Sequence, residues 1–176
     1  PTSWSRDGRF LLFNSVDPQT NVDMWVAPTT GDRTPSVFLK TPFRELGGAF
    51  SPDGRWVAYM SNESGRQEVY VTPFVPPMDP NSAESPAAGG GKWQVSTAGG
   101  IYPVWRPDGK ALFYLNPAGA MMASEMRVSP GTEVACASCI APGWKAVIWL
   151  LSVSVMMIAC AVYCDATVVT SEVSTP

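Results

Sequence analysis

A short turn motif occurs three times in this chain and limits the folds available to it more than any other feature. The copies are WSRDGR at residues 4–9, FSPDGR at residues 50–55 and WRPDGK at residues 105–110, and each leads into an apolar run. Pro suits the first corner of a type I turn, Asp suits the second, and Gly reaches the positive φ that closes a bulged hairpin. Each copy therefore predicts a strand that turns back into a second strand. The structural turn residues predicted in this way are Asp7, Gly8, Asp53, Gly54, Asp108 and Gly109.

The spacing of the copies indicates repeated blades. The Asp-Gly pairs lie 46 and then 55 residues apart, and the longer interval contains the Pro/Ala/Gly-rich segment Val75 to Gly91. A period in this range, with four short strands per unit, is typical of β-propellers. The second strand of each unit is nearly continuously apolar, as expected for a sheet that is covered on both faces. We therefore predict an all-β chain: a partial β-propeller of about three four-stranded antiparallel blades, followed by an atypical apolar tail.

The predicted propeller domain covers residues 1–135, with blades at about 1–41, 42–98 and 99–135. We expect Val75 to Gly91 to be a mobile loop between the third and fourth strands of the second blade, because its prolines cannot sustain a hydrogen-bond ladder. Propellers typically have four to eight blades, so three blades cannot close a ring. The remaining blades of a parent protein are therefore expected partners.

Composition removes several classes of function. The 176 residues include no His, which excludes a Ser-His-Asp triad, a Cys-His dyad and an imidazole metal site. The net charge of −3 gives no basis for nucleic-acid binding. We predict no catalytic residue, no cofactor and no metal site, and the sequence does not identify the protein or small ligand that the chain binds.

Five carboxylates are placed in equivalent positions of the repeats. Asp7, Asp53 and Asp108 could form a metal row around a channel, but we expect each to be held in its own turn by accepting backbone N–H groups. Asp23 and Glu68 each begin a strand that continues into an aromatic residue, which could make a row of ligands. We expect them instead to be solvated, because charged residues are mostly exposed.

Three aromatic residues also recur at one position, directly before the turns. We expect Trp4, Phe50 and Trp105 to pack between blades rather than to form a ligand cage.

The character of the chain changes after Ala135. Residues 136–176 carry three charged side chains and all four cysteines, and they contain the uncharged run Ala146 to Tyr163. Three interpretations compete. The run has the length of a short membrane-spanning helix, so the tail could be a membrane anchor. The cysteines could bind zinc, although the apolar segment between the first two cysteines and the last two argues against a zinc site. We favour the third, a tail translated in a shifted frame, because no fourth Asp-Gly turn appears. The four cysteines are Cys136, Cys139, Cys160 and Cys164.

Several strings resemble a known family. SPDGRWVAY, SNESGRQEVYV, KWQVSTAGG and VWRPDGKALFYL resemble the TolB-like, WD-repeat-related (SPDG) propellers of bacteria, over residues 1–135. The similarity is greatest to the propeller that follows the kinase domain and membrane segment of many bacterial serine/threonine protein kinases. This resemblance implies a non-catalytic binding or sensing module on the periplasmic or extracytoplasmic side of a membrane. Arg6 departs from the family pattern, because it replaces the turn Pro.

Two other functions stay open. One is a free periplasmic TolB-type scaffold that binds protein partners. The other is the propeller of a prolyl-oligopeptidase-like serine peptidase, which needs a Gly-x-Ser-x-Gly elbow and a His that this sequence lacks. Kinase motifs are also absent, so any kinase activity would belong to upstream sequence. Because the chain begins without Met and inside an expected strand, we take it to be a fragment.

Overall fold

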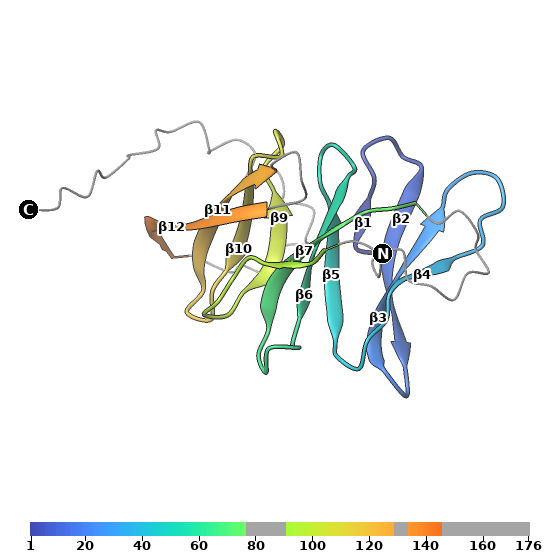
Figure 1. Ribbon diagram of the computed structural model, residues 1–176, viewed down its shortest axis with the longest axis horizontal. Coiled ribbons are helices and arrows are strands. Elements are labelled where there is room, and N and C mark those ends of the chain that lie inside the picture. The colour runs from blue at the N-terminus through green and yellow to red at the C-terminus, as the bar shows by residue number, and fades with distance from the viewer. Residues whose placement is uncertain (77–90, 129–133, 146–176) are drawn as a thin grey trace, which may run out of the picture. The chain divides into compact units, whose positions relative to one another are not determined.

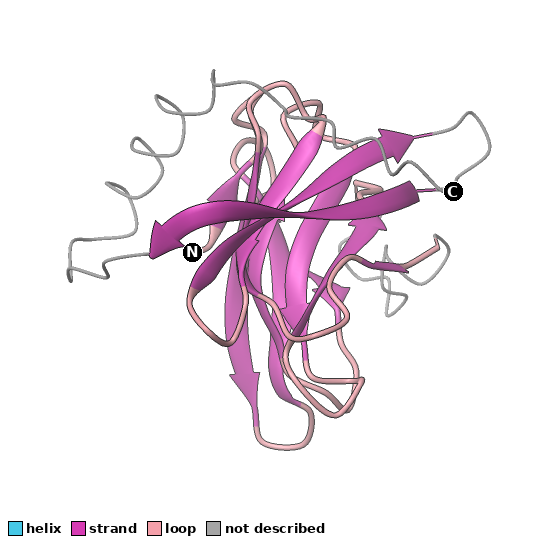
Figure 2. Ribbon diagram, turned by 90° about the vertical axis from the view of Figure 1, so that its left-hand side faces the viewer, coloured by secondary structure: helices cyan, strands magenta, loops and turns pink. Residues whose placement is uncertain are grey.

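The computed structural model describes residues 1–76, 91–128 and 134–145, with the backbone alone for 127, 128 and 134–145. These residues form three four-stranded antiparallel sheets, each made of strands that follow one another in sequence. The sheets succeed one another as the colour runs from blue to orange in Figure 1, and Figure 2 shows strands and loops throughout. The predicted partial propeller of three four-stranded antiparallel blades is therefore confirmed. Within the described ranges, no helix has the length and apolarity needed to cross a bilayer.

Each sheet keeps its strands in sequence order. The first sheet contains β1 (Ser3–Trp4), β2 (Phe10–Asp17), β3 (Asn21–Pro28) and β4 (Ser36–Leu39). The second contains β5 (Glu45–Phe50), β6 (Trp56–Ser61), β7 (Glu68–Pro73) and β8 (Trp93–Gln94). The third contains β9 (Ile101–Trp105), β10 (Ala111–Leu115), β11 (Ala120–Val128) and β12 (Val134–Lys145).

The third sheet continues past Ala135, where the sequence changes character. Its last strand, β12, pairs antiparallel with β11 and ends at Lys145. All three sheets belong to one compact unit, Pro1–Ala146, and the second unit, Val147–Pro176, lies outside the described residues. The candidate membrane run Ala146 to Tyr163 and most of the expected loop, residues 77–90, also lie outside them. A domain boundary at residue 135 therefore stays a prediction.

The hydrophobic core lies on both sides of the second sheet. All six residues of β6 are buried, which confirms the prediction from its continuous apolar run. Val57 and Tyr59 pack into a cluster with residues of the first sheet, and Trp56 and Ala58 pack into a second cluster with residues of the third. Alternate side chains of a strand point to opposite faces. The middle blade is therefore held by apolar contacts on each face.

The recurring aromatics are explained by the order of the sheets. Phe50 packs against Phe74 with ring centroids 4.8 Å apart, in the cluster shared with the first sheet. The Trp105 Nε1 donates a 3.1 Å hydrogen bond to the Ala49 carbonyl of the second sheet. Each therefore contacts the sheet that precedes its own. Trp4 is 61% exposed, so the expectation that it packs between blades is wrong for this residue.

The three Asp-Gly turns have the same backbone geometry. In each, the Gly N–H donates to the carbonyl three residues earlier, at 2.9 Å for Gly8 and Gly54 and 2.8 Å for Gly109. The three glycines have φ angles of +72°, +70° and +74°. L-residues rarely adopt such angles, which explains why Gly occupies this position in every copy.

Asp23 and Glu68 are fully buried, so the expectation that they are solvated is wrong. The burial of Glu68 is compensated by polar neighbours. Glu68 accepts hydrogen bonds from the Ser96 hydroxyl, from the Arg66 Nε at 2.8 Å and from the Gly99 N–H at 2.9 and 3.0 Å. Asp23 accepts a 2.8 Å hydrogen bond from the Thr20 hydroxyl. Both carboxylates therefore anchor loops inside the fold.

Glu45, at the start of β5, is a third buried carboxylate. One of its oxygens accepts a hydrogen bond from the Thr41 hydroxyl, and the other has no partner among the described residues. Burial, with a smaller effect of the negative charge of Asp23, raises the pKa of Glu45 to about 7, although the hydrogen bond from Thr41 lowers it. Glu45 therefore takes up a proton when the chain folds near pH 6.

We expect Gly54→Val to lower the melting temperature of the chain, because a β-branched residue resists positive φ. Strain of this kind costs about 1–3 kcal/mol, and roughly 2–4 °C is lost per kcal/mol in a chain of this size. Gly54→Asn is the matched control, since Asn tolerates the left-handed region and no atom lies within 4 Å of an added Cβ. Equal melting temperatures for wild type and Gly54→Val would contradict the turn geometry.

Glu45 should make the chain less stable as pH rises from about 4.5 to about 7. The folded state binds its proton more tightly than the unfolded state, so stability is full below the unfolded pKa and is lost as pH passes through the folded one. Glu45→Gln removes this titration, and we expect the variant to exceed wild type by roughly 1–3 kcal/mol at pH 8 but not at pH 4.5. Urea unfolding at both pH values measures the difference. A constant difference between the two proteins would contradict the raised pKa.

Candidate functional site

The side chains of the first two Asp-Gly turns form one repeated network. In the second turn, Asp53 accepts hydrogen bonds from the Ser51 hydroxyl at 2.6 Å, from the Arg55 N–H at 3.1 Å and from the Arg55 Nε at 2.6 Å. Asp7 accepts the same three bonds from Ser5 and Arg9 in the first turn. Each carboxylate is therefore held inside its own turn, next to one cation.

The third turn obtains the same result with different residues. Arg106 stands where the other turns have Ser, and its Nε donates a 2.7 Å hydrogen bond to Asp108. The Lys110 N–H donates a second bond, at 2.9 Å. The cation that holds Asp108 therefore comes before the turn rather than after it, and the ammonium group of Lys110 is not used for this purpose.

These contacts keep all three carboxylates ionised. The Ser5 hydroxyl and then the Arg9 N–H lower the pKa of Asp7 to about 2. Burial would raise the pKa of Asp53, but the hydrogen bonds from Ser51 and Arg55 outweigh it and lower the pKa. The Arg106 hydrogen bond lowers the pKa of Asp108. None of the three is a proton donor near neutral pH.

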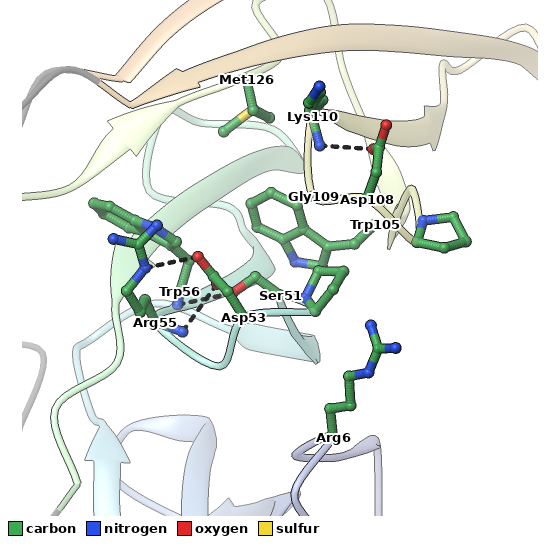
Figure 3. A pocket seen from close by; sticks show the side chains of 12 residues that line it. Arg6, Ser51, Asp53, Arg55, Trp56, Trp105, Asp108, Gly109, Lys110 and Met126 are labelled. Atoms are coloured by element: carbon green, nitrogen blue, oxygen red, sulfur yellow. Dashed lines mark hydrogen bonds and ion pairs between the residues drawn. The ribbon is translucent and has the colours of Figure 1, made fainter.

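A pocket of about 400 Å³ opens beside these turns (Figure 3). Its walls come from all three blades: one residue from the first turn, five from the second blade, five from the third turn and its flanking residues, and one from β11. The lining residues are Arg6, Ser51, Pro52, Asp53, Arg55, Trp56, Trp105, Pro107, Asp108, Gly109, Lys110 and Met126.

The pocket is polar on one side and apolar on the other. Trp56 and Met126 are buried behind it, at 8% and 7% exposure, and Trp105 is partly exposed. Arg6 extends from the first turn toward the other two, as Figure 3 shows. A concave site with aromatic walls and a few convergent charges is the usual form of a small-ligand site.

Three of the predicted turn residues line this pocket, and three do not. Asp53, Asp108 and Gly109 are in its wall, while Asp7, Gly8 and Gly54 are not. In the part of the chain that the structure describes, no group of three or more carboxylate or sulfur ligands could hold a metal ion. The metal row that Asp7, Asp53 and Asp108 could have formed is therefore not assembled.

Sequence reasoning missed the residues that give the pocket its charge and its apolar wall. Arg6 was visible as a departure from the turn Pro, but nothing local indicated that it points toward the other turns. Lys110 stands where the first two turns have Arg, and the sequence analysis did not single it out. Trp56 and Met126 are brought together only by the packing of the second sheet on the third.

Comparison with known proteins identifies solved structures that share the fold of this chain. No family model matches this chain, and no curated protein matches it. A solved structure described as a putative TolB from Agrobacterium tumefaciens aligns with a TM-score of 0.54 and 17% identity, over 78% of this chain and 48% of that one. TolB from Acinetobacter baumannii aligns with a TM-score of 0.53 and 14% identity, over 76% of this chain and 31% of that one.

The chain thus spans less than half the length of either TolB structure. At this identity the likeness concerns architecture alone. The blades, their strand order and these alignments together establish that the chain has the fold of a TolB-like β-propeller, of which it forms a part.

Proposed function

We propose that this chain is a non-catalytic binding module, and that it belongs to the sensor or interaction region of a bacterial serine/threonine protein kinase. The observation that carries the binding role is the pocket beside the Asp-Gly turns, because three successive blades contribute side chains to it. Trp105, Lys110 and Arg6 are not needed to form their turns. Their convergence on one pocket is what a binding site requires.

The chemistry of the pocket supports binding rather than catalysis. The Ser51 hydroxyl donates to Asp53 at 2.6 Å and accepts the Trp56 N–H at 3.0 Å, so it is occupied on both sides by its own turn. Asp53 has a lowered pKa and is a weak base near neutral pH. A serine nucleophile needs a basic partner that can take its proton, and this pair does not offer one.

The assignment to a kinase is supported by the sequence strings of the three repeats. They resemble the propellers that follow the membrane segment in such kinases, which also favours an extracytoplasmic location. Trp4 is 61% exposed at the position where Phe50 and Trp105 each contact a preceding sheet. An exposed aromatic of this kind is what an adjoining blade would cover, in keeping with a longer parent protein.

The alternative is a periplasmic TolB-type scaffold, which the two TolB structures support equally well at the level of fold. The propeller of a prolyl-oligopeptidase-like peptidase is a further alternative within the same architecture. All three place a binding surface on a propeller and differ in what is encoded beside it.

A sequence read of the parent locus, through the codons around Ala135 and into both flanks, tests the parentage. We expect kinase motifs and a membrane segment upstream, and further Asp-Gly repeats in another frame after Ala135. A secretory signal without kinase motifs would establish the scaffold instead. A downstream Gly-x-Ser-x-Gly elbow with a His would establish the peptidase.

A further inference from the structure

The first and second blades meet at a buried acid that the next junction, between the second and third blades, does not have. Glu45 lies five residues before Phe50, and Gly100 lies five residues before Trp105. A Cβ at Gly100 would lie 2.5 Å from the Ser96 Oγ and 2.9 Å from its Cβ, so a side chain does not fit there. Glu45 therefore departs from the repeat, and it adds a carboxyl group to the interior of the first junction.

Contacts with both blades place Glu45 at this junction. Its strand, β5, belongs to the second sheet and packs against β2 and β3 of the first. The Asn14 side-chain amide, on β2, donates a 2.9 Å hydrogen bond to the Glu45 carbonyl and accepts a 3.4 Å hydrogen bond from the Gly47 N–H. The side chain of Glu45 is buried, so water does not reach the carboxyl group while the two blades are packed together.

The two junctions satisfy their buried carboxylates differently. At the second junction, the Ser96 hydroxyl and the Gly99 N–H donate to Glu68, and both of its carboxylate oxygens are used. Thr41 stands nine residues before Phe50, as Ser96 stands before Trp105, but its hydroxyl donates to Glu45. The other carboxyl oxygen of Glu45 has no hydrogen-bond partner among the described residues.

The charges around Glu45 oppose its ionisation. Asp23 and Glu63 both act on it, and both are negative. The ammonium of Lys40 lies 2.5 Å from Asp17 and 3.7 Å from Asp23, and in the part of the chain that the structure describes no cation forms an ion pair with Glu45. The strands packed against β5 carry four ionisable residues: Asp17 on β2, Asp23 on β3, Tyr59 on β6 and Tyr102 on β9.

We propose that Glu45 makes the junction of the first two blades a proton-sensitive contact. The blades stay packed while its carboxyl group is protonated. The ionised group is more stable where water can solvate it, so loss of the proton raises the fraction of molecules in which this junction is open. The second junction has Gly100 at the equivalent position and keeps its packing. The effect does not depend on what the pocket beside the turns binds.

The direction of the response follows from the two states of the junction. The pKa of Glu45 is about 7 with the junction closed and returns toward its ordinary value of 4.5 when water reaches the carboxyl group. The closed state therefore binds the proton more tightly. Its advantage is full below about pH 4.5, is lost as pH rises to about 7, and changes little above that.

Backbone amides that donate across each junction report its opening. At the first junction, the Gly47 N–H donates to the first blade, and the Phe50 N–H donates a 3.2 Å hydrogen bond to the Ser3 hydroxyl oxygen. At the second junction, the Gly100 N–H donates a 2.9 Å hydrogen bond to the Gln67 carbonyl. Opening of one junction exposes its own amides to exchange with solvent.

Hydrogen exchange of the whole chain, resolved by residue with NMR at pH 5 and pH 8 and corrected for intrinsic exchange rates, tests the proposal. We expect the protection of the Gly47 and Phe50 amides to fall about 10- to 100-fold between these pH values, and that of Gly100 to stay constant. Equal falls at both junctions would show that Glu45 is linked only to global unfolding, and constant protection at the first would show no linkage. Either result would overturn the proposal.

Three variants assign the effect to its residue. Glu45→Gln cannot ionise, so we expect the fall in protection at Gly47 and Phe50 to disappear, and a fall that persists would contradict the proposal. Asp23→Asn removes a neighbouring negative charge, so the fall should be smaller and should end at a lower pH; this variant decides the question if Glu45→Gln does not fold. Asp32→Asn is the matched control, because it neutralises an exposed carboxylate of the first blade and should keep the wild-type profile.

Discussion

The second blade has no core of its own, because its central strand buries side chains on both faces, each against a neighbouring sheet. In β6, Val57 and Tyr59 pack toward the first sheet while Trp56 and Ala58 pack toward the third. Buried apolar surface contributes about 25 cal/mol per Å², and the second blade gains this on both faces only when its two neighbours are in place. This stacking sets the positions of the Asp-Gly turns, and the turns bring their side chains together at one pocket.

The fold was largely predictable because local and global signals agreed. The turn residues specify a corner, the apolar run after it specifies a doubly covered strand, and the period specifies blades. The burial of Glu68 was not predictable in the same way. Its partners Ser96 and Gly99 lie 28 and 31 residues further along the chain, beyond any local pattern. The rule that charges are exposed fails where distant groups supply hydrogen bonds.

The sequence predicted the turns that surround the candidate site but not the charged and apolar side chains that line it. The turn carboxylates were the obvious residues, and they are held by their own turns. The charged side chains available to a ligand are those of Arg6 and Lys110, which line the pocket but do not hold the carboxylates of their turns. A comparison of the three copies reveals Arg6 as a departure, whereas the presence of both residues in one pocket depends on how the blades pack. Repeats thus separate the residues that maintain a fold from those that are free to vary with function.

The third blade supplies Trp105, Lys110 and Met126 to the pocket, yet only its contact with the second blade is part of the described structure. In stacked repeats, stability is close to a sum of nearest-neighbour terms, so the contact between the second and third blades contributes directly to stability. A ligand that binds only when the third blade is packed on the second adds its binding free energy to the stability of that interface. Occupancy of the pocket and the stability of the contact between the second and third blades are therefore thermodynamically linked. A molecule bound to both blades holds them together.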